Sequence, residues 1–461
     1  MAIQCISPID GSVYAERATL SKSEASAAVN RATFAQTLWA ARPLNERIKL
    51  VQAGVAAIGA MNDQIVLELA HQMGRPVRYG GEFSGFNERA SYMADIAHEA
   101  LAPIEVENSN SFCRIIKRIP HGLVLVVAPW NYPYMTAINT VAPALIAGNA
   151  VMLKHASQTP LVGEQMAAAF HSVGIPEDVF QNVFLDHEVT LGLISNRAFG
   201  FVNFTGSVNG GKAIEAAASG TFTNIALELG GKDPGYVMED ANLDAAVDTL
   251  IDGAMFNSGQ CCCGIERIYV HERLFNNFIE KAVAIVNQYK LGNPLKPETT
   301  LGPMAHERFA KEVREQTADA IAAGAKAHIN SSDFPENEGA YLMPQILTNV
   351  THDMRVMREE SFGPVVGIMS VKDDAEAIRL MNDSNFGLTA SLWTKDVDRA
   401  EAIADQIETG TVFMNRADYL DPGLCWTGCK DTGRGGGLSV IGYHNLTRPK
   451  SFNGTKAVGG R

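Results

Sequence analysis

Between residues 120 and 230, short runs rich in β-forming residues alternate with stretches that have helical periodicity. The helical stretches include Met135 to Ala147, which Gly148 ends, and Leu161 to Val173, which Gly174 ends. The predicted strands between them are Leu123 to Val127, Ala150 to Leu153, Asn182 to Leu185, Phe201 to Phe204 and Asn224 to Leu229. This alternation predicts parallel βαβ units and a doubly wound sheet, whose ligands bind at the carboxyl ends of the strands.

Further elements are predicted on both sides of this region. Three amphipathic helices come first: a capping box at Ser21-x-x-Glu24 begins the first, Pro43 begins the second, and Gly74 with Pro76 ends the third. A second alternating series fills residues 231 to 430 and predicts a second α/β domain. Its predicted strands include Ile265 to Val270, Val365 to Met369, Ser391 to Thr394 and Thr411 to Asn415.

One segment has no helical pattern. Ile104 to Val106 and Phe112 to Ile116 enclose a polar turn, which indicates a two-stranded arm. A lone two-stranded hairpin is at best marginally stable in water, so we expect other strands to complete it.

The charge balance excludes several classes of partner. The chain has 38 Lys and Arg against 51 Asp and Glu, a formal charge of −13, so no long-range field would attract nucleic acid or an anionic membrane. Its most apolar stretch, residues 141 to 153, is broken by Pro143, Gly148 and Asn149. The first residues lack the basic and apolar regions of a signal peptide. We therefore expect no membrane span and a cytoplasmic location.

Three consecutive cysteines, Cys261 to Cys263, lie in the glycine-containing segment Asn257 to Gly264. Zinc ligands usually have a different spacing, and neighbouring side chains are expected to diverge, so we predict no metal site. Each thiol could be a small buried apolar group, or one could be an accessible thiolate nucleophile in a loop between a helix and a strand.

Three other segments follow predicted strands. Glu228 ends an apolar strand, where partial burial would raise its pKa and suit it to act as a general base; it could also be a solvated strand-end carboxylate. Asn131 could donate a hydrogen bond to an oxyanion or occupy a turn. The segment Phe204 to Gly211 opens a helix and could hold a phosphate, although alone it is a weak signal.

Together, these four segments resemble the aldehyde dehydrogenase superfamily in their order and spacing, from Ser7-Pro-Ile-Asp-Gly11 to Arg448-Pro-Lys450. Lys154, Glu359-Glu-Ser-Phe-Gly-Pro364, Asn385-Phe-Gly-Leu388 and Trp426-Thr-Gly-Cys-Lys-Asp-Thr-Gly433 reinforce the resemblance. It implies an α/β, aldehyde dehydrogenase-like fold in three parts. These are a Rossmann-type NAD(P)-binding domain (1–102 and 120–230), an α/β catalytic domain (231–430), and a β oligomerisation arm with the C-terminal segment (103–119 and 431–461). We expect the arm and the last strand to pair between subunits of a homodimer or homotetramer.

The resemblance also implies roles for individual residues. Cys262 is the nucleophile, Asn131 the oxyanion donor, Glu228 the general base, and Lys154 both catalytic and cofactor-binding. The implied cofactor-binding residues are Trp130, Lys154, Ser157, Thr205, Gly206, Ser207, Leu229, Glu360 and Phe362. The implied reaction is oxidation of an aldehyde to a carboxylic acid with NADP or NAD, through a thiohemiacetal and a thioester that a Glu-activated water hydrolyses.

Cofactor choice is expected to depend on Ser157. Members that prefer NAD usually have Glu there, whose charge repels a 2′-phosphate, whereas Ser157 belongs to the Ala-Ser signature of succinate semialdehyde dehydrogenases. NADP should therefore be accepted. The acidic segment Asp186-His-Glu188, where a glycine-rich turn is usual, could oppose it.

Substrate choice is inferred from what the pocket lacks. Succinate semialdehyde dehydrogenases place Arg at two pocket positions that here are Asn139 and Phe256. Without a cation, burial of a carboxylate is costly, so we expect an uncharged or aromatic aldehyde, bounded also by Tyr132, Tyr134 and Met135. These aromatic residues could equally be ordinary core. The alternatives are a succinate semialdehyde dehydrogenase that uses another cation, and a non-catalytic member of the family.

Overall fold

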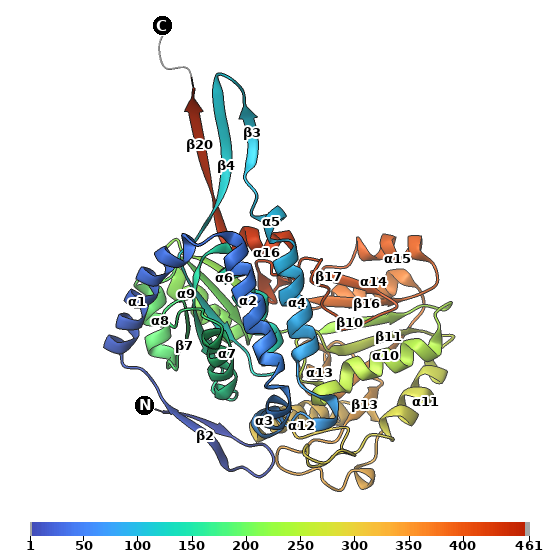
Figure 1. Ribbon diagram of the computed structural model, residues 1–461. Helices are drawn as coiled ribbons and strands as arrows, with labels where there is room; N and C mark the ends of the chain where they lie inside the picture. Colours follow the sequence, from blue (N-terminus) through green and yellow to red (C-terminus); the bar gives the residue numbers. More distant parts are fainter. Residues whose placement is uncertain (1, 457–461) are drawn as a thin grey trace.

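Six strands form the first sheet of the computed structural model, which describes residues 2–456 (Figure 1). Their order is β19-β9-β8-β5-β6-β7, and all are parallel except β19. The bounds are β5 Leu123–Ala128, β6 Ala150–His155, β7 Phe180–Asn182, β8 Phe201–Thr205, β9 Asn224–Glu228 and β19 Gly433–Arg434. The predicted parallel sheet is confirmed, but the predicted strand at 182–185 is wrong in position. The chain leaves the sheet after Asn182 and passes Leu20, whose N–H donates to the Phe184 carbonyl (2.9 Å).

Helices cover both faces of this sheet because its central strand is apolar on both sides. On β5, Val124 and Val126 pack into the core formed with α2, α6 and α7, whereas Leu125 and Val127 pack into the core formed with α1, α8 and α9. The Ser21/Glu24 capping box is present, and Gly74 ends α3 with φ 81°. The bounds are α1 Lys22–Ala40, α2 Leu44–Gly59, α3 Asn62–Met73, α6 Pro133–Ala147, α7 Pro160–Ser172, α8 His187–Ser195 and α9 Val208–Ala218.

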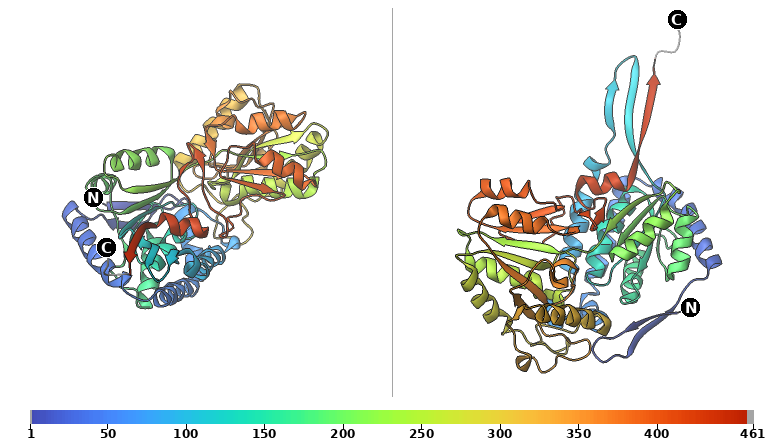
Figure 2. Two further views of the ribbon diagram at one scale, coloured as in Figure 1. Left: turned by 90° about the horizontal axis from the view of Figure 1, so that it is seen from above. Right: turned by 180° about the vertical axis from the view of Figure 1, so that it is seen from behind.

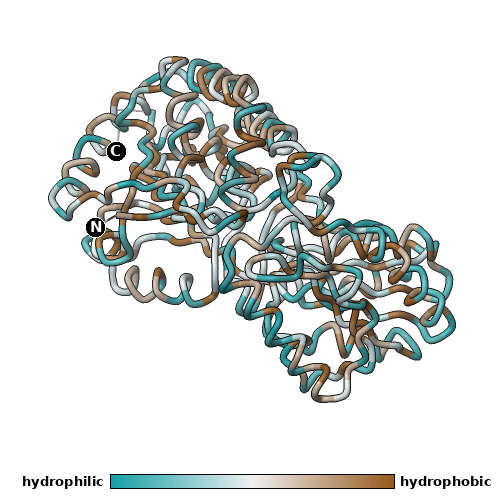
Figure 3. The backbone as a smooth tube through the Cα atoms, turned by 90° about the horizontal axis from the view of Figure 1, so that it is seen from below, coloured by the Kyte–Doolittle hydropathy of each residue, from teal (hydrophilic) through white to brown (hydrophobic). Residues whose placement is uncertain are grey.

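A second, seven-stranded sheet has the order β12-β13-β14-β11-β10-β16-β17, with only β12 antiparallel. Its strands are β10 Asp233–Val237, β11 Ile265–His271, β12 Lys326–Ala327, β13 Gln345–Thr348, β14 Val365–Val371, β16 Thr389–Trp393 and β17 Thr411–Met414. The helices around it are α10 Leu243–Met255, α11 Phe275–Val286, α12 Glu307–Ala322, α13 Arg355–Arg358, α14 Asp374–Asn382 and α15 Val397–Ala404. The two sheets form separate lobes, and apolar segments run through the interior of both (Figure 3).

Three strands project from the body as the arm (Figures 1 and 2). They are β3 Ile104–Asn108, β4 Phe112–Pro120 and β20 Thr447–Thr455, in the order β20-β4-β3. The last strand pairs with β4 of its own chain along the length of that strand, which leaves β20 and β3 as the two edges of the arm. Part of the segment assigned to the arm, β19, joins the first sheet instead. Association into a homodimer or homotetramer stays a prediction.

Several elements were not predicted. A hairpin of β1 Ala2–Ile6 and β2 Val13–Ala18 precedes the helices, so the helices do not come first. Helices α4 Phe83–Asp95 and α5 Ala97–Ala100 follow α3, and α16 Ser439–Asn445 precedes β20. The short elements are β15 Phe386–Gly387, β18 Cys429–Lys430 and the 3-10 turns Val77–Tyr79, Phe256–Gly259 and Ser331–Asp333.

Within residues 2–456, no single helix has the length and apolar composition needed to cross a membrane. The α2–α3 pair passes that test only jointly and is bent by 69°.

Candidate active site

The three cysteines lie in a tight loop between α10 and β11. Asn257, Ser258 and Gly259 all have positive φ, and a Cβ at Gly259 would come within 2.3 Å of the Gly363 backbone. The Gln260 side chain holds the loop, since its Oε1 accepts from the Ala305 N–H (2.7 Å) and its Nε2 donates to the Asn257 carbonyl (3.0 Å). The sequence thus folds into a fixed loop that presents the half-buried Cys262.

The sulfur atoms of Cys261, Cys262 and Cys263 converge and lie within 4.8 Å of one another. Our expectation that consecutive side chains diverge is wrong here, because a turn closed by the Gly264 N–H on the Cys261 carbonyl (3.1 Å) folds them together. Hydrogen bonds from the other two thiols hold the pKa of Cys262 well below its usual value, against the opposing effect of burial. Donation to Cys262 raises the pKa of Cys261 to about 12. The arrangement therefore favours one thiolate, on Cys262.

Asn131 follows β5 and lies against the cysteine loop. Its side chain is buried, and its Nδ2 donates to the Gln260 carbonyl at 3.3 Å. The N–H of Cys262 donates to no acceptor within residues 2–456. An amide donor and a free backbone N–H next to the thiol are the two groups that an oxyanion requires.

A buried ion pair that the sequence did not reveal fixes Asn131. Arg75 donates to Glu82 (2.7 Å), to the Asn131 carbonyl (2.6 Å) and to Asn257 Oδ1 (3.3 Å). Arg75 thereby ties the loop of the amide donor to the loop of the nucleophile. Its partner Glu82 accepts from the N–H groups of Tyr134 (3.0 Å) and Met135 (2.8 Å) and so caps α6 from outside that helix.

Glu228 is the last residue of β9, as predicted. Burial, the largest effect, raises its pKa to about 7, and a hydrogen bond from the Thr205 hydroxyl (3.3 Å) opposes this rise. Two glycines beyond it allow close approach. A Cβ at Gly231 would lie 2.5 Å from the Cys262 carbonyl oxygen, and one at Gly230 would lie 2.4 Å from a Glu360 oxygen. The glycines therefore let the cysteine loop and the Glu360 segment meet at the end of β9.

The predicted cofactor-side aromatics do come together. The ring of Trp130 stacks on Phe309 (5.2 Å between centroids) and meets the edge of Phe362 (5.5 Å). The backbone N–H groups of Ser361 and Phe362 each donate to the Glu266 carboxylate (2.8 Å). This carboxylate is paired with the buried Lys232 (2.5 Å), so a second ion pair that sequence reasoning missed holds the Phe362 segment in place.

The Glu360 carboxyl and the Lys154 ammonium, two of the predicted cofactor-binding groups, belong to partly buried residues. Glu360 accepts from the Gly231 N–H (3.0 Å), and burial raises its pKa to about 8. Lys154 lies near the carboxyl end of β6, and burial lowers its pKa. Within residues 2–456 its ammonium makes no ion pair or hydrogen bond. Ser157, three residues further on, is exposed.

In the turn after β8, some of the groups that could bind a phosphate already make hydrogen bonds within the protein. The Gly206 N–H donates to the Glu228 carbonyl (3.1 Å), and Ser207 caps α9 by accepting from the Gly210 N–H (3.2 Å). Leu229 is buried and donates its N–H to the Thr432 carbonyl (2.9 Å). The Ser207 side chain is exposed and its proton remains available to a ligand.

The predicted substrate residues separate into two groups. Tyr134 is core rather than pocket, because its hydroxyl donates to the buried Gln165 and its ring meets the edge of Phe86. Asn139 is buried, and its Oδ1 accepts from Arg89 on α4 at 3.4 Å. The Met135 carbonyl accepts from the same guanidinium at 3.1 Å. A cation that the sequence analysis did not consider therefore contacts two of the predicted pocket residues.

The rings of Tyr132 and Phe256 each contact another side chain near the cysteine loop. The guanidinium of Arg75 lies over the Tyr132 ring at 4.8 Å, and Phe256 meets Tyr79 edge-on at 4.8 Å. Both rings are half-buried.

His155 is buried at the end of β6. Its Nε2–H donates to the Pro133 carbonyl (3.2 Å), and burial lowers its pKa to about 3, so the ring is neutral. It therefore joins β6 to the start of α6.

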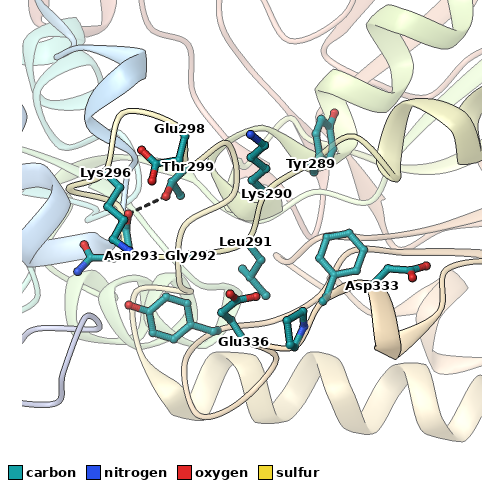
Figure 4. Close-up of a pocket in the computed structure, with 13 residues that line it drawn as sticks. Tyr289, Lys290, Leu291, Gly292, Asn293, Lys296, Glu298, Thr299, Asp333 and Glu336 are labelled. Atoms are coloured by element: carbon teal, nitrogen blue, oxygen red, sulfur yellow. Dashed lines mark hydrogen bonds between the residues drawn. The ribbon is translucent and has the colours of Figure 1, made fainter.

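A cavity of about 570 Å³ lies elsewhere, between segments 289–299 and 333–341 of the second lobe (Figure 4). Within it, the Thr299 hydroxyl donates to the Asn293 carbonyl (2.7 Å). None of the predicted site residues lines it, so the reactive groups and this cavity are separate features.

Comparison with known proteins agrees with this geometry. The model of the Aldehyde dehydrogenase family matches residues 1–452. A succinate-semialdehyde dehydrogenase [NADP(+)] of Deinococcus radiodurans is 30% identical over 446 residues, covering 96% of this chain and 93% of its own. An aldehyde dehydrogenase of Paenarthrobacter nicotinovorans is 34% identical, covering 98% and 99%. The structure of the NADP-dependent glyceraldehyde-3-phosphate dehydrogenase of Bacillus halodurans complexed with NADP superposes with a TM-score of 0.93 at 31% identity, covering 99% of this chain and 96% of that one.

The order of the motifs, the fold and these matches over nearly the whole length lead to one conclusion: the chain belongs to the aldehyde dehydrogenase family.

Proposed function

We propose that this chain oxidises an aldehyde to a carboxylic acid with a nicotinamide cofactor, using Cys262 as the nucleophile. The observation that carries the proposal is the position of Cys262. Its thiol has a lowered pKa, and the Asn131 amide is hydrogen-bonded to the same loop. The Glu228 carboxylate, with a pKa of about 7, is the last residue of β9. Each group has the protonation behaviour that its role requires.

Acylation begins with attack of the Cys262 thiolate on the aldehyde carbon, which gives a thiohemiacetal. The developing oxyanion accepts hydrogen bonds from Asn131 Nδ2, which leaves the Gln260 carbonyl, and from the free N–H of Cys262. A bound nicotinamide supplies the acceptor for the hydride. The Arg75–Glu82 pair keeps Asn131 in register with Cys262 while the carbonyl re-forms as a thioester.

Hydrolysis then uses Glu228. Its carboxylate takes a proton from water, the resulting hydroxide attacks the thioester carbonyl, and the carbon–sulfur bond breaks to release the acid. The leaving Cys262 thiolate is stabilised by the thiols of Cys261 and Cys263, and the site returns to its starting state when Glu228 gives its proton to solvent.

The residues on the cofactor side fit a dinucleotide with an added phosphate. Lys154 offers an ammonium without a protein acceptor in the described chain, and the exposed Ser157 brings no negative charge. In the acidic segment, Glu188 pairs with Lys22 (2.6 Å) and Asp186 caps α8 (2.7 Å to the Val189 N–H), although the charge of Asp186 still acts on Lys154, where it opposes the lowering of the pKa by burial. These contacts support NADP as an accepted cofactor, alongside NAD.

We expect Ser157→Glu to lower kcat/KM for NADP relative to NAD by about tenfold or more, because a carboxylate there would repel the 2′-phosphate. The matched control is Ser157→Gln, which has the same shape without the charge. Initial rates with both cofactors check this, and equal losses for the two cofactors in Ser157→Glu would contradict it.

We also expect the rate to depend on pH through Glu228. A general base acts when deprotonated, and its pKa is about 7, so kcat limited by thioester hydrolysis should fall about tenfold per pH unit below that value and level off above it. Steady-state rates from pH 5.5 to 9 measure the profile. A rate that stays level down to pH 5.5 would contradict a base whose pKa is about 7.

Absorbance of the reduced nicotinamide tests the function itself. Purified protein with NADP or NAD and a panel of aldehydes should produce the reduced cofactor and one equivalent of acid. Absence of turnover with every aldehyde would favour a non-catalytic role.

A further inference from the structure

Arg89 is a buried cation without a carboxylate partner. Only 8% of its surface is exposed, and none of the ion pairs within residues 2–456 includes it. Its Nη1 donates to the Met135 carbonyl (3.1 Å) and to Asn139 Oδ1 (3.4 Å), both on α6. A guanidinium in such a place keeps its charge, and burial of an unpaired charge is costly.

Two nitrogens of the guanidinium are unused. Nε and Nη2 have no acceptor in the described chain, yet neither is a fully enclosed nitrogen without a partner. Both are therefore at least slightly accessible on a side chain that is otherwise enclosed. Arg89 thus presents unused donors beside Met135 and Asn139, two of the predicted pocket residues, and we call these three residues the predicted pocket wall.

This wall lies close to the reacting groups. Burial, the largest effect, lowers the pKa of Arg89, and the charges of nearby acidic groups oppose this, first Glu82 and then also Cys262 and Glu228 of the candidate site. Helix α6, which carries Met135 and Asn139, begins two residues after Asn131. The free donors of Arg89 are therefore within electrostatic reach of the thiol that would hold the aldehyde carbon.

We propose that Arg89 binds a carboxylate at the far end of the aldehyde substrate, with Asn139 orienting its guanidinium. The proposal rests on the proposed function and names the substrate class. By the resemblance, succinate semialdehyde dehydrogenases carry an Arg at the position of Asn139. Here the cation is Arg89 of α4 instead, and it donates to the Asn139 side chain. This reverses the expectation of an uncharged substrate.

The physical reason is the fork geometry of arginine. Two parallel N–H donors match the two oxygens of a carboxylate, and the charge removes the penalty for burying it. The contact with Asn139 Oδ1 uses only Nη1, so Nε and Nη2 remain for such a bidentate pair. A neutral aldehyde of equal length would leave the guanidinium without this partner.

The test compares 4-oxobutanoate with 4-oxobutanamide, and 4-formylbenzoate with 4-formylbenzamide, so that the members of each pair have nearly the same size and differ chiefly in the distal charge. The wild-type chain should have a higher kcat/KM for the carboxylate of at least one pair, mainly through a lower KM. In Arg89→Met, the charged-to-neutral ratio of kcat/KM should fall on the order of 100-fold. Arg89→Lys, which keeps the charge without the fork, should recover part of this loss.

A matched control is Arg31→Met, which removes an exposed arginine of α1 paired with Asp178. Its charged-to-neutral ratio should equal that of the wild type. If Arg89 serves only to fasten α4 to α6, Arg89→Met and Arg89→Lys will lower both members of each pair alike, which would overturn the proposal. A wild-type preference for the neutral member of both pairs would also overturn it, whereas failure to oxidise any of the four aldehydes would refute the proposed function.

Discussion

Replacement of Cys262 by alanine is expected to abolish aldehyde oxidation, with kcat lowered by about 10⁴-fold or more. The thioester route has no substitute for the missing sulfur, because the neighbouring thiols are held protonated; donation to Cys262 raises the pKa of Cys261 to about 12. Reduced-cofactor absorbance measures the loss. Cofactor binding, followed by quenching of tryptophan fluorescence, should persist.

The matched controls are Cys261→Ala and Cys263→Ala, which remove the donors and keep the nucleophile. Each should retain turnover but need a higher pH for it, since loss of a donor raises the pKa of Cys262. Appreciable oxidation by Cys262→Ala would refute the assignment of the nucleophile, and complete inactivity of a control alone would move that role to a neighbouring sulfur.

Replacement of Glu228 by glutamine is expected to leave one rapid turnover and then stop. Formation of the thioester does not use this carboxylate, whereas hydrolysis does, so a burst of reduced cofactor equal to the enzyme should precede a steady rate lowered by about 10²- to 10⁴-fold. Stopped-flow absorbance resolves the two phases. The slow rate should lack the pH limb near 7 that the wild-type carboxyl provides.

Glu360→Gln is the matched control for this variant. Burial raises the pKa of Glu360 to about 8, so it resembles Glu228 electrostatically, but it accepts from the Gly231 N–H and is predicted to bind the cofactor. Its replacement should weaken cofactor binding without accumulation of an acyl enzyme. Unimpaired steady-state turnover of Glu228→Gln would show that another group activates the water.

Much of the fold follows from local patterns. The apolar run of β5, buried on both faces, and the glycines that end α6 and α7 predicted the first sheet and its helices. The Ser21 capping box fixed the start of α1. Helix α4 was not predicted because it lacks a capping motif in the sequence. Glu82 lies at its N-terminus, but the Glu82 carboxylate caps α6 instead.

The candidate site was predictable where a motif carries the chemistry in consecutive residues, as around Cys262 and Glu228. It was not predictable where the chemistry depends on distant partners. Arg75 and Arg89 have no motif of their own, and their significance comes from contacts across the fold with Asn131 and Asn139. The convergence of the three sulfurs likewise depends on the turn from Cys261 to Gly264, which no motif in the sequence predicts.

The acyl enzyme is the most direct test of the central claim, that Cys262 carries the substrate through a thioester. The Glu228→Gln variant is mixed with NADP and with an aldehyde that gives a burst of reduced cofactor. The reaction is then quenched in acid, and the digested protein is measured by mass spectrometry. We expect a peptide heavier by the mass of the aldehyde less two hydrogen atoms, with fragment ions that place the added mass on Cys262. A burst of reduced cofactor without this adduct, or with the adduct on Cys261 or Cys263, would contradict it.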